Sequence, residues 1–317
     1  MGEKGRRRFV AMLAPLALVA CATKPAGPPL AVGAVWEVRK GDVVGHLVAS
    51  FHSGVGRELV LSDRLAAVIA GAGVVAFESI PQAGRDPRER PPVIAIHLRG
   101  TSETLESELG PVLAARVRGA LADYGAPAGA WESLGKLRLP FVKVGLAVAT
   151  GMGLDSQWGL VAPDPMAGLD ELILREAQRN ARPLAELESA TAVNRARVRL
   201  TREEALAEIE ALVLRLEMLP RGTLPEVDAA VIGPMLAGDV EASYAAYRSR
   251  YCAPPPLDRA CDKTADDRNE DMASRFEALL AEGRRPLGVA GAYHLAGPAG
   301  LPVLLEKRGY AVKRLAP

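Results

Sequence analysis

Two segments at opposite ends of the chain repeat one short pattern that includes two of its four histidines. Residues 48–52 read VASFH and residues 290–294 read AGAYH, so each has two small residues, an aromatic residue and a histidine after an apolar run. Small residues let the backbone approach a ligand or another strand closely. A histidine that ends such a run lies at the edge where open α/β sheets bind ligands. The pattern therefore predicts two strands that end at a ligand-binding edge.

The two histidines of this pattern, His52 and His294, are candidate metal ligands. Two neutral imidazoles brought together by a fold make half of a metal site. A single histidine after a strand can equally be a hydrogen-bonded structural residue, and that alternative stays open for each. His97 lacks the pattern, and we interpret it as structural. His46 precedes His52 by six residues, about 20 Å at a strand rise of roughly 3.3 Å per residue, too far to share its site.

The apolar periodicities alternate between strand and helix, which predicts an α/β fold. We expect a central mixed β-sheet flanked by helices, with a helical insertion between the two halves at about residues 100–250. Expected strands cover residues 35–38, 43–51, 74–77, 183–187, 287–290 and 311–315. Expected helices cover residues 57–70, 101–124, 168–180, 201–216, 240–247, 264–282 and 300–308. Thr101 or Ser102 is expected to cap the second of these helices.

The N-terminus predicts export and a lipid anchor. Basic residues at positions 4–8 precede an uncharged apolar run at positions 9–20, which is too short to span a bilayer as a mature helix. The sequence LVA before Cys21 resembles the lipobox of bacterial lipoproteins, which implies cleavage before Cys21 and lipidation of that cysteine. An uncleaved anchor or an ordinary signal peptide is the alternative.

Three segments follow from this N-terminal interpretation. We expect a lipoprotein signal peptide at residues 1–20, a lipidated cysteine and tether at residues 21–30, and one domain at residues 31–317. Because residue 22 is Ala and not Asp, the resemblance to lipoproteins favours the outer membrane, with the domain facing the periplasm.

The net charge gives no indication of nucleic-acid binding, and the cysteine content predicts a disulfide. Removal of residues 1–20 takes away four positive charges and one negative charge, which changes the formal net charge from +1 to −2. A nearly neutral domain with 4% aromatic residues gives no indication of nucleic-acid binding. Cys252 and Cys261 remain after Cys21, and an even pair in an exported protein predicts a disulfide. Two free thiols are the alternative.

Carboxylates occur where expected strands end. Glu78 follows the apolar run at residues 74–77, and a carboxylate in such a place needs a partner. It is a candidate metal ligand or general base, with a structural ion pair as the alternative. Asp170 and Glu188 are weaker candidates, since Asp170 opens an expected helix and could cap it.

Arg268 and Asn269 lie near the start of the expected helix at residues 264–282. Helical spacing places both on its apolar side, together with Met272 and Phe276. An arginine in that position requires a carboxylate or a substrate. A substrate contact and a buried structural ion pair are both compatible with this spacing.

These segments resemble the TraB/GumN family, which is related to the Tiki-type metalloproteases. Residues 35–52 are similar to its opening hairpin with a Gly-x-x-His motif, and Glu78 stands where the family has a strand-end glutamate. The positions that match its C-terminal block are Arg268, Asn269, residues 291–294, Gly297, Gly300 and residues 309–310. Asp170 and residues 187–189 resemble its middle motifs. The resemblance spans about residues 31–317.

One position departs from the family pattern, because Ala49 stands where the family has glycine. If that position requires a positive φ, a β-carbon costs roughly 1–2 kcal/mol. If it requires only close approach, the alanine crowds the site slightly.

The resemblance implies an α/β fold and, for characterised relatives, divalent-metal-dependent peptide hydrolysis. We therefore expect a metal-dependent hydrolase of the peptidase type, anchored in the bacterial envelope through the lipid on Cys21. His52, Glu78 and His294 would bind Mn, Co, Zn or Fe, which mixed nitrogen and oxygen ligands do not distinguish. Glu78, Arg268 and Asn269 would be catalytic, with Arg268 stabilising negative charge on a peptide or protein substrate. The alternative is a non-catalytic envelope binding protein or accessory lipoprotein on the same fold.

Overall fold

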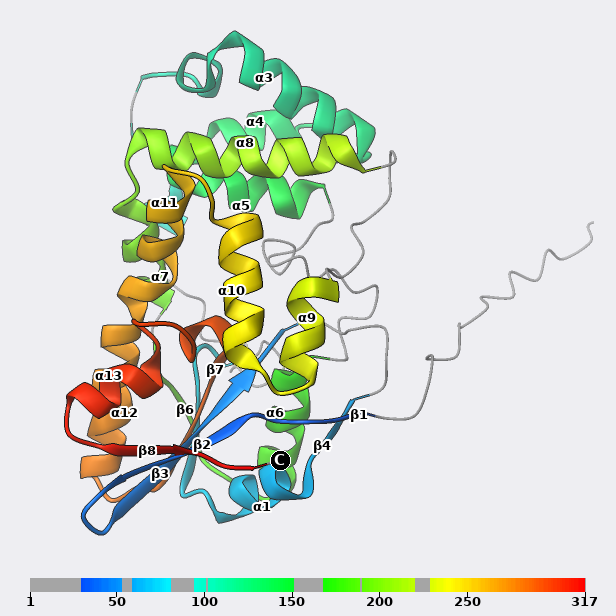
Figure 1. Ribbon diagram of the computed structural model, residues 1–317. Coiled ribbons are helices and arrows are strands. Elements are labelled where there is room, and N and C mark those ends of the chain that lie inside the picture. The colour runs from blue at the N-terminus through cyan, green and yellow to red at the C-terminus, as the bar shows by residue number, and fades with distance from the viewer. Residues whose placement is uncertain are drawn as a thin grey trace, which may run out of the picture.

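A computed structural model describes residues 30–52, 59–80, 94–100, 102–150, 168–188, 190–219 and 229–316. The expected signal peptide, Cys21 and most of the tether lie outside these residues. The strands are β1 (Leu30–Val32), β2 (Val35–Lys40), β3 (Val43–Ser50), β4 (Leu59–Leu61), β5 (Val74–Phe77), β6 (Leu184–Glu186), β7 (Pro286–Gly291) and β8 (Ala311–Arg314). Six of them form a central sheet in the order β6-β5-β7-β3-β2-β8, and β1 pairs with β4 (Figure 1). The predicted α/β fold with a mixed sheet is confirmed.

The pairing of β3 with its neighbours determines where the site forms. Strands β2 and β3 form the expected antiparallel hairpin, with Val35 opposite Val48. Strand β3 also pairs with β7 in parallel, with Ser50 opposite Gly291. On its other side β7 pairs in parallel with β5. Strands β3, β7 and β5 therefore end at one edge of the sheet.

Two glycines shape the face of the sheet on which α12 (Asn269–Ala281) packs. A β-carbon on Gly45 would lie 3.0 Å from Cζ of Phe276, and one on Gly288 would lie 3.1 Å from Cδ2 of the same ring. The missing side chains thus form a recess for Phe276, which is fully buried. The neighbouring helix α13 (Leu301–Lys307) packs against α12 and follows the same side of the sheet (Figure 1).

Helices α1 (Asp63–Gly71) and α6 (Leu169–Arg179) pack together on the opposite side of the sheet (Figure 1). The helix expected at residues 57–70 is shorter than predicted, because residues 59–61 form β4 and Ser62 caps α1 by accepting a hydrogen bond from the backbone N–H of Leu65. The amphipathic helix α6 matches its expected range closely, and it buries Leu169, Ile173 and Leu174 against the main core. It brings its N-terminal turn to the end of β3.

The helical insertion is confirmed as a group of helices with its own apolar core. It contains α3 (Leu105–Asp123), α4 (Ala130–Gly135), α5 (Leu139–Ala149) and α8 (Arg202–Met218), and it lies at one end of the sheet (Figure 1). Thr104 caps α3, not the predicted Thr101 or Ser102. Thr201 and Glu204 form a capping box at the start of α8. Among the described residues, every helix is too short or too polar to cross a membrane.

The prediction of a helix at residues 264–282 is wrong for the first turn. Helix α11 (Leu257–Thr264) ends at Thr264, a 3₁₀ turn covers Asp266–Arg268, and α12 begins only at Asn269. The sequence contains no proline or glycine at this break, so apolar periodicity continued through it. Six helices of the described residues were not predicted: α4 and α5 of the insertion, α2 (Ile94–His97), α7 (Ala190–Val198), α9 (Ala229–Leu236) and α11.

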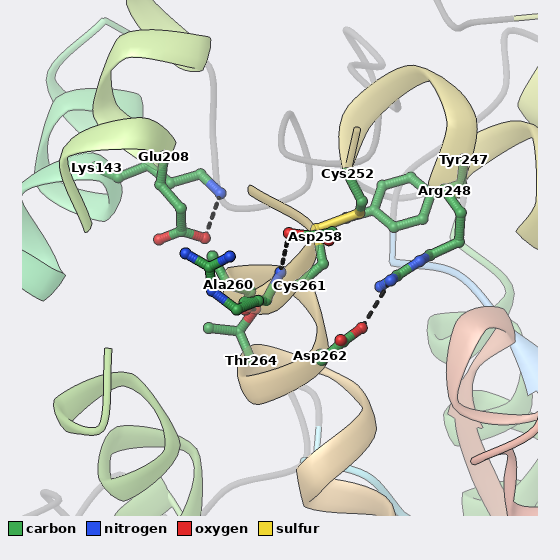
Figure 2. The surroundings of a disulfide bond; sticks show 11 residues. Lys143, Glu208, Tyr247, Arg248, Cys252, Asp258, Ala260, Cys261, Asp262 and Thr264 are labelled. Carbon is green, nitrogen blue, oxygen red and sulfur yellow. Dashed lines mark hydrogen bonds and ion pairs between the residues drawn. A yellow bond between two sulfur atoms is a disulfide. The ribbon is translucent and has the colours of Figure 1, made fainter. Parts of the chain in front are cut away.

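Cys252 and Cys261 form a disulfide in the structure, with their Cα atoms 5.9 Å apart (Figure 2). The bond joins the end of α10 (Val240–Tyr251) to α11. The ring of Tyr247 stacks on Tyr293 with 4.3 Å between centroids, so this small cluster also contacts the residue before His294. The disulfide therefore holds the connection that leads from α10 to Arg268.

Candidate functional site

His52 and His294 follow the ends of two neighbouring parallel strands. Ala49 is opposite Ala290 in the β3–β7 ladder, so the two repeated sequence segments run side by side in almost the same register. His294 is buried in the 3₁₀ turn Ala292–His294, whereas His52 is largely exposed just after β3. The end of β3 points towards the side of the molecule that carries the insertion (Figure 1).

Glu78 lies directly after β5 and contacts the His294 segment. Its Oε1 atom is 3.4 Å from Nε2 of His294, and its Oε2 accepts a 3.0 Å hydrogen bond from the backbone N–H of Gly291. A β-carbon on Gly291 would lie 3.3 Å from this Oε2 atom, so glycine allows the carboxylate to approach the backbone. Glu78 and His294 are thus brought together as predicted from the strand ends.

Arg268 joins two carboxylates in the interior. Its Nε lies 2.9 Å from both carboxylate oxygens of Glu188, and its Nη2 donates to Glu78 at 2.6 Å and also to Glu188. The Nη1 atom donates to the backbone carbonyl of Thr264 at 3.1 Å. The Arg268 and Glu188 side chains are almost fully buried. Of the two interpretations of Arg268, the structure thus contains the carboxylate pairing, and a substrate contact stays a prediction.

Asn269 fixes the orientation of His294. Its Nδ2 donates to the backbone carbonyl of Ala299 at 2.8 Å, which leaves Oδ1 to face Nδ1 of His294 at 2.6 Å. An amide oxygen can only accept, so Nδ1 carries the proton of this hydrogen bond. The other nitrogen, Nε2, is the one that faces Glu78. At the start of α12, Arg268 therefore holds the carboxylate of Glu78 and Asn269 holds the imidazole of His294.

The ionisation of Glu78 is governed by its neighbours. Burial alone would raise the pKa of Glu78, but attraction to His294 and Arg268 outweighs burial and holds this pKa well below its usual range. Glu78 therefore stays ionised within the site. Glu78 and the buried carboxylate of Glu188 share one permanent cation, Arg268, while the buried carboxylate of Asp170 lies beside His52. With neutral imidazoles the three carboxylates and Arg268 have a formal charge of −2, which favours the binding of a cation.

Asp170 lies beside His52 and does not act as the helix cap that the sequence suggested. Residue Gly168 occupies the N-cap of α6, and Oδ2 of Asp170 contacts Nδ1 of His52. The Asp170 side chain comes from the opposite side of the sheet to Arg268 and Asn269. Asp170 and Glu188, the weaker candidates from the sequence, thus both contact other candidate residues. For Glu188 a signal existed, because it follows β6 much as Glu78 follows β5.

The predicted ligands His52, Glu78 and His294 offer nitrogen and oxygen donors. Imidazole and carboxylate donors suit Mn, Co, Zn or Fe, and a buried oxygen of Asp170, Oδ1, has no hydrogen-bond partner among the described residues. In the described part of the chain, however, no three His, Cys, Asp or Glu side chains converge to form a complete metal-binding group. Glu78 and His294 lie together, while His52 contacts Asp170. The donor chemistry fits a divalent ion, and the three ligands are not preassembled.

Ala49, which replaces a family glycine, has ordinary strand geometry. It lies within β3, and its backbone N–H donates to the carbonyl of Ala34 at 3.0 Å. Among the described residues other than glycine, only Ala181 and Arg285 have a positive φ. The backbone strain considered for this position is therefore absent.

A cavity of about 1150 Å³ lies at the other end of β3. Its walls include Val44 and His46 of β3, Arg64 and Val68 of α1, and Arg285 before β7. None of the predicted site residues lines it. The residues that bear the candidate chemistry gather instead at the carboxyl ends of the strands, where open α/β sheets place their sites.

Fold and site together define an α/β protein with histidines and carboxylates gathered at the ends of β3, β5, β6 and β7. Comparison with known families agrees with this class. The family model of the TraB/PrgY/gumN family matches residues 34–314, so the chain belongs to that family. No curated protein matches the chain, and no solved structure matches it either.

Proposed function

We propose that this protein is a divalent-metal-dependent hydrolase of the peptidase type. The observation that supports it most directly is the placement of two histidines after neighbouring parallel strands, beside three carboxylates. Glu78 and Glu188 share Arg268, while Asp170 contacts His52. Buried negative charge in such excess needs a compensating cation. Family membership is consistent with the proposal.

The residues of the site would have separate roles. His52, Glu78 and His294 would hold the ion, and the ion would supply a bound water of lowered pKa as the nucleophile. Asn269 would keep Nε2 of His294 directed at the site through the hydrogen bond at Nδ1. Arg268 would hold Glu78 in place through their 2.6 Å contact, in addition to its predicted stabilisation of negative charge on the substrate.

Metal content is the measurement that tests this proposal. Full-length protein purified without chelator and incubated with Mn, Co or Zn is expected to retain about one ion per chain by inductively coupled plasma mass spectrometry, because the site provides three donors. The double variant His52→Ala/His294→Ala is expected to retain none. His97→Ala is the matched control, since His97 lies on α2 and bonds Asn194, away from the site. Equal metal content in wild type and double variant would refute the proposal.

The second candidate function is a non-catalytic binding protein or accessory protein on the same fold. The observation in its favour is that the three predicted ligands are not preassembled among the described residues, while Glu78 is already bonded to Arg268 and Gly291. This alternative expects no bound metal in any of the proteins measured. Such a result would direct attention to binding partners.

We further propose that the protein is anchored in the envelope, facing the periplasm, by a lipid on Cys21. The basic and apolar N-terminus and the lipobox-like LVAC sequence support this location, and the Cys252–Cys261 disulfide is compatible with an oxidising compartment. Cys21→Ser is expected to move most of the protein from the membrane fraction to the soluble fraction on immunoblots. Cys252→Ser leaves the lipobox intact and serves as the control. An unchanged distribution of the Cys21→Ser variant would contradict lipidation at this residue.

A further inference from the structure

The contact between Asp170 and His52 has the geometry by which a carboxylate orients an imidazole ring. Oδ2 of Asp170 contacts Nδ1 of His52, and the Asp170 side chain is only 8% exposed. Asp170 is the second residue of α6, whose neighbouring side chains Leu169 and Ile173 are buried in the main core. The carboxylate is therefore held on a rigid element, while the histidine follows the last residues of β3.

Close backbone contact fixes the two segments relative to each other. Gly168 precedes α6, and a β-carbon on this residue would lie 2.5 Å from the carbonyl oxygen of His52 and 3.0 Å from that of Phe51. Real β-carbons do not approach a backbone oxygen this closely, so glycine is required for the segments to touch. The turn before α6 thus places Asp170 at one defined position beside the imidazole.

The chemistry of the contact selects one form of the imidazole. An ionised carboxylate only accepts hydrogen bonds, so a neutral His52 must carry its proton on Nδ1. The lone pair is then on Nε2. The remaining oxygen of Asp170, Oδ1, is buried without a hydrogen-bond partner among the described residues, so no described lysine or arginine competes with His52 for this carboxylate.

We propose that Asp170 is a positioning residue that keeps His52 in the Nδ1–H form and thereby presents Nε2 as the nitrogen for a ligand. The consequence for metal affinity rests on the proposed function, whereas the control of the tautomer does not. Metal-ligating histidines commonly donate their second ring N–H to a carboxylate, and loss of such a partner typically weakens metal binding by about 10–100-fold.

Nitrogen-15 NMR of the imidazoles tests the proposal directly, because the chain has only four histidines. At about pH 8, where an ordinary imidazole is neutral, wild-type His52 is expected to show a protonated Nδ1 and an unprotonated Nε2. Asp170→Leu retains much of the volume of the side chain but offers no hydrogen-bond acceptor, and Asp170→Ala offers neither the volume nor an acceptor. Both variants are expected to shift His52 towards the Nε2–H form, while His294 keeps the tautomer set by Asn269.

Glu171→Gln is the matched control, since it removes a neighbouring charge of α6 that pairs with Arg175 instead of a histidine. It is expected to leave the His52 signals unchanged. A wild-type His52 in the Nε2–H form, or tautomer populations unaffected by both Asp170 variants, would overturn the proposal.

A titration with Mn or Zn separates this proposal from the proposed function. If wild type binds metal, the Asp170 variants are expected to bind it about 10–100-fold more weakly. If wild type binds no metal but the tautomer shifts in the variants, the proposed hydrolase fails and the positioning role of Asp170 stands. If wild type does bind metal and both variants bind it with the same affinity, the positioning role is overturned.

Discussion

Replacing Arg268 with methionine is expected to lower the free energy of unfolding by about 3–5 kcal/mol, the usual cost of removing one partner from a buried ion pair. Methionine fills much of the same volume but leaves Glu188 and Glu78 buried together without their cation. The desolvation penalty of both carboxylates is then uncompensated. Urea unfolding followed by circular dichroism measures this loss.

Two comparisons assign the loss to the ion pairs. Arg275→Met changes an exposed arginine on the same helix and is expected to alter stability by less than about 0.5 kcal/mol. In the double variant Arg268→Met/Glu188→Gln, the removal of one buried charge should restore part of the stability lost in Arg268→Met. A loss below about 1 kcal/mol for Arg268→Met would mean that water reaches these carboxylates.

Replacing Phe276 with alanine is expected to cost about 3–5 kcal/mol, because the ring fills a recess that the rest of the structure cannot close. The recess exists because Gly45 and Gly288 lack side chains on adjacent strands, and the ring is fully buried against them. The same helix carries Asn269 at its start, so the ring also seats the helix that orients His294. Thermal and urea unfolding measure the cost.

Phe276→Leu is the informative companion variant, since it retains most of the apolar volume and should lose clearly less stability than Phe276→Ala. Val112→Ala, at a position that is 73% exposed, should have an effect below about 0.5 kcal/mol. Equal losses in the leucine and alanine variants would show that the shape of the ring, and not the buried volume, determines the stability.

The sequence predicted the fold well where apolar periodicity and local breaks agree. The strand at residues 74–77 has the predicted bounds, because four apolar residues follow a glycine and precede Glu78. The two histidine segments were recognised from their repeated pattern, and the parallel pairing of β3 with β7 explains the repetition physically.

The partners of the site residues could not be predicted in the same way. Glu188 reaches Arg268 and Asp170 reaches His52 across the fold, so neither pairing has a signature in local sequence. The break before Asn269 has the same origin. The chain leaves the helical path at Asp266–Arg268, where Arg268 contacts two carboxylates from other segments. Apolar periodicity along the sequence does not reveal such long-range contacts.

The parallel pairing of β3 with β7 also determines when the candidate site can form during synthesis of the chain. Ser50 and Gly291 are neighbours in the sheet but lie far apart in the sequence, so β3 is synthesised well before β7. Until β7 emerges, the β2–β3 hairpin has an unpaired edge, and such edges are prone to wrong pairing. Contacts of this sequence separation form slowly because a long loop must close first. A truncated chain that ends before residue 286 therefore lacks His294, the central strand and the site together, and the histidine at residue 52 then has no counterpart.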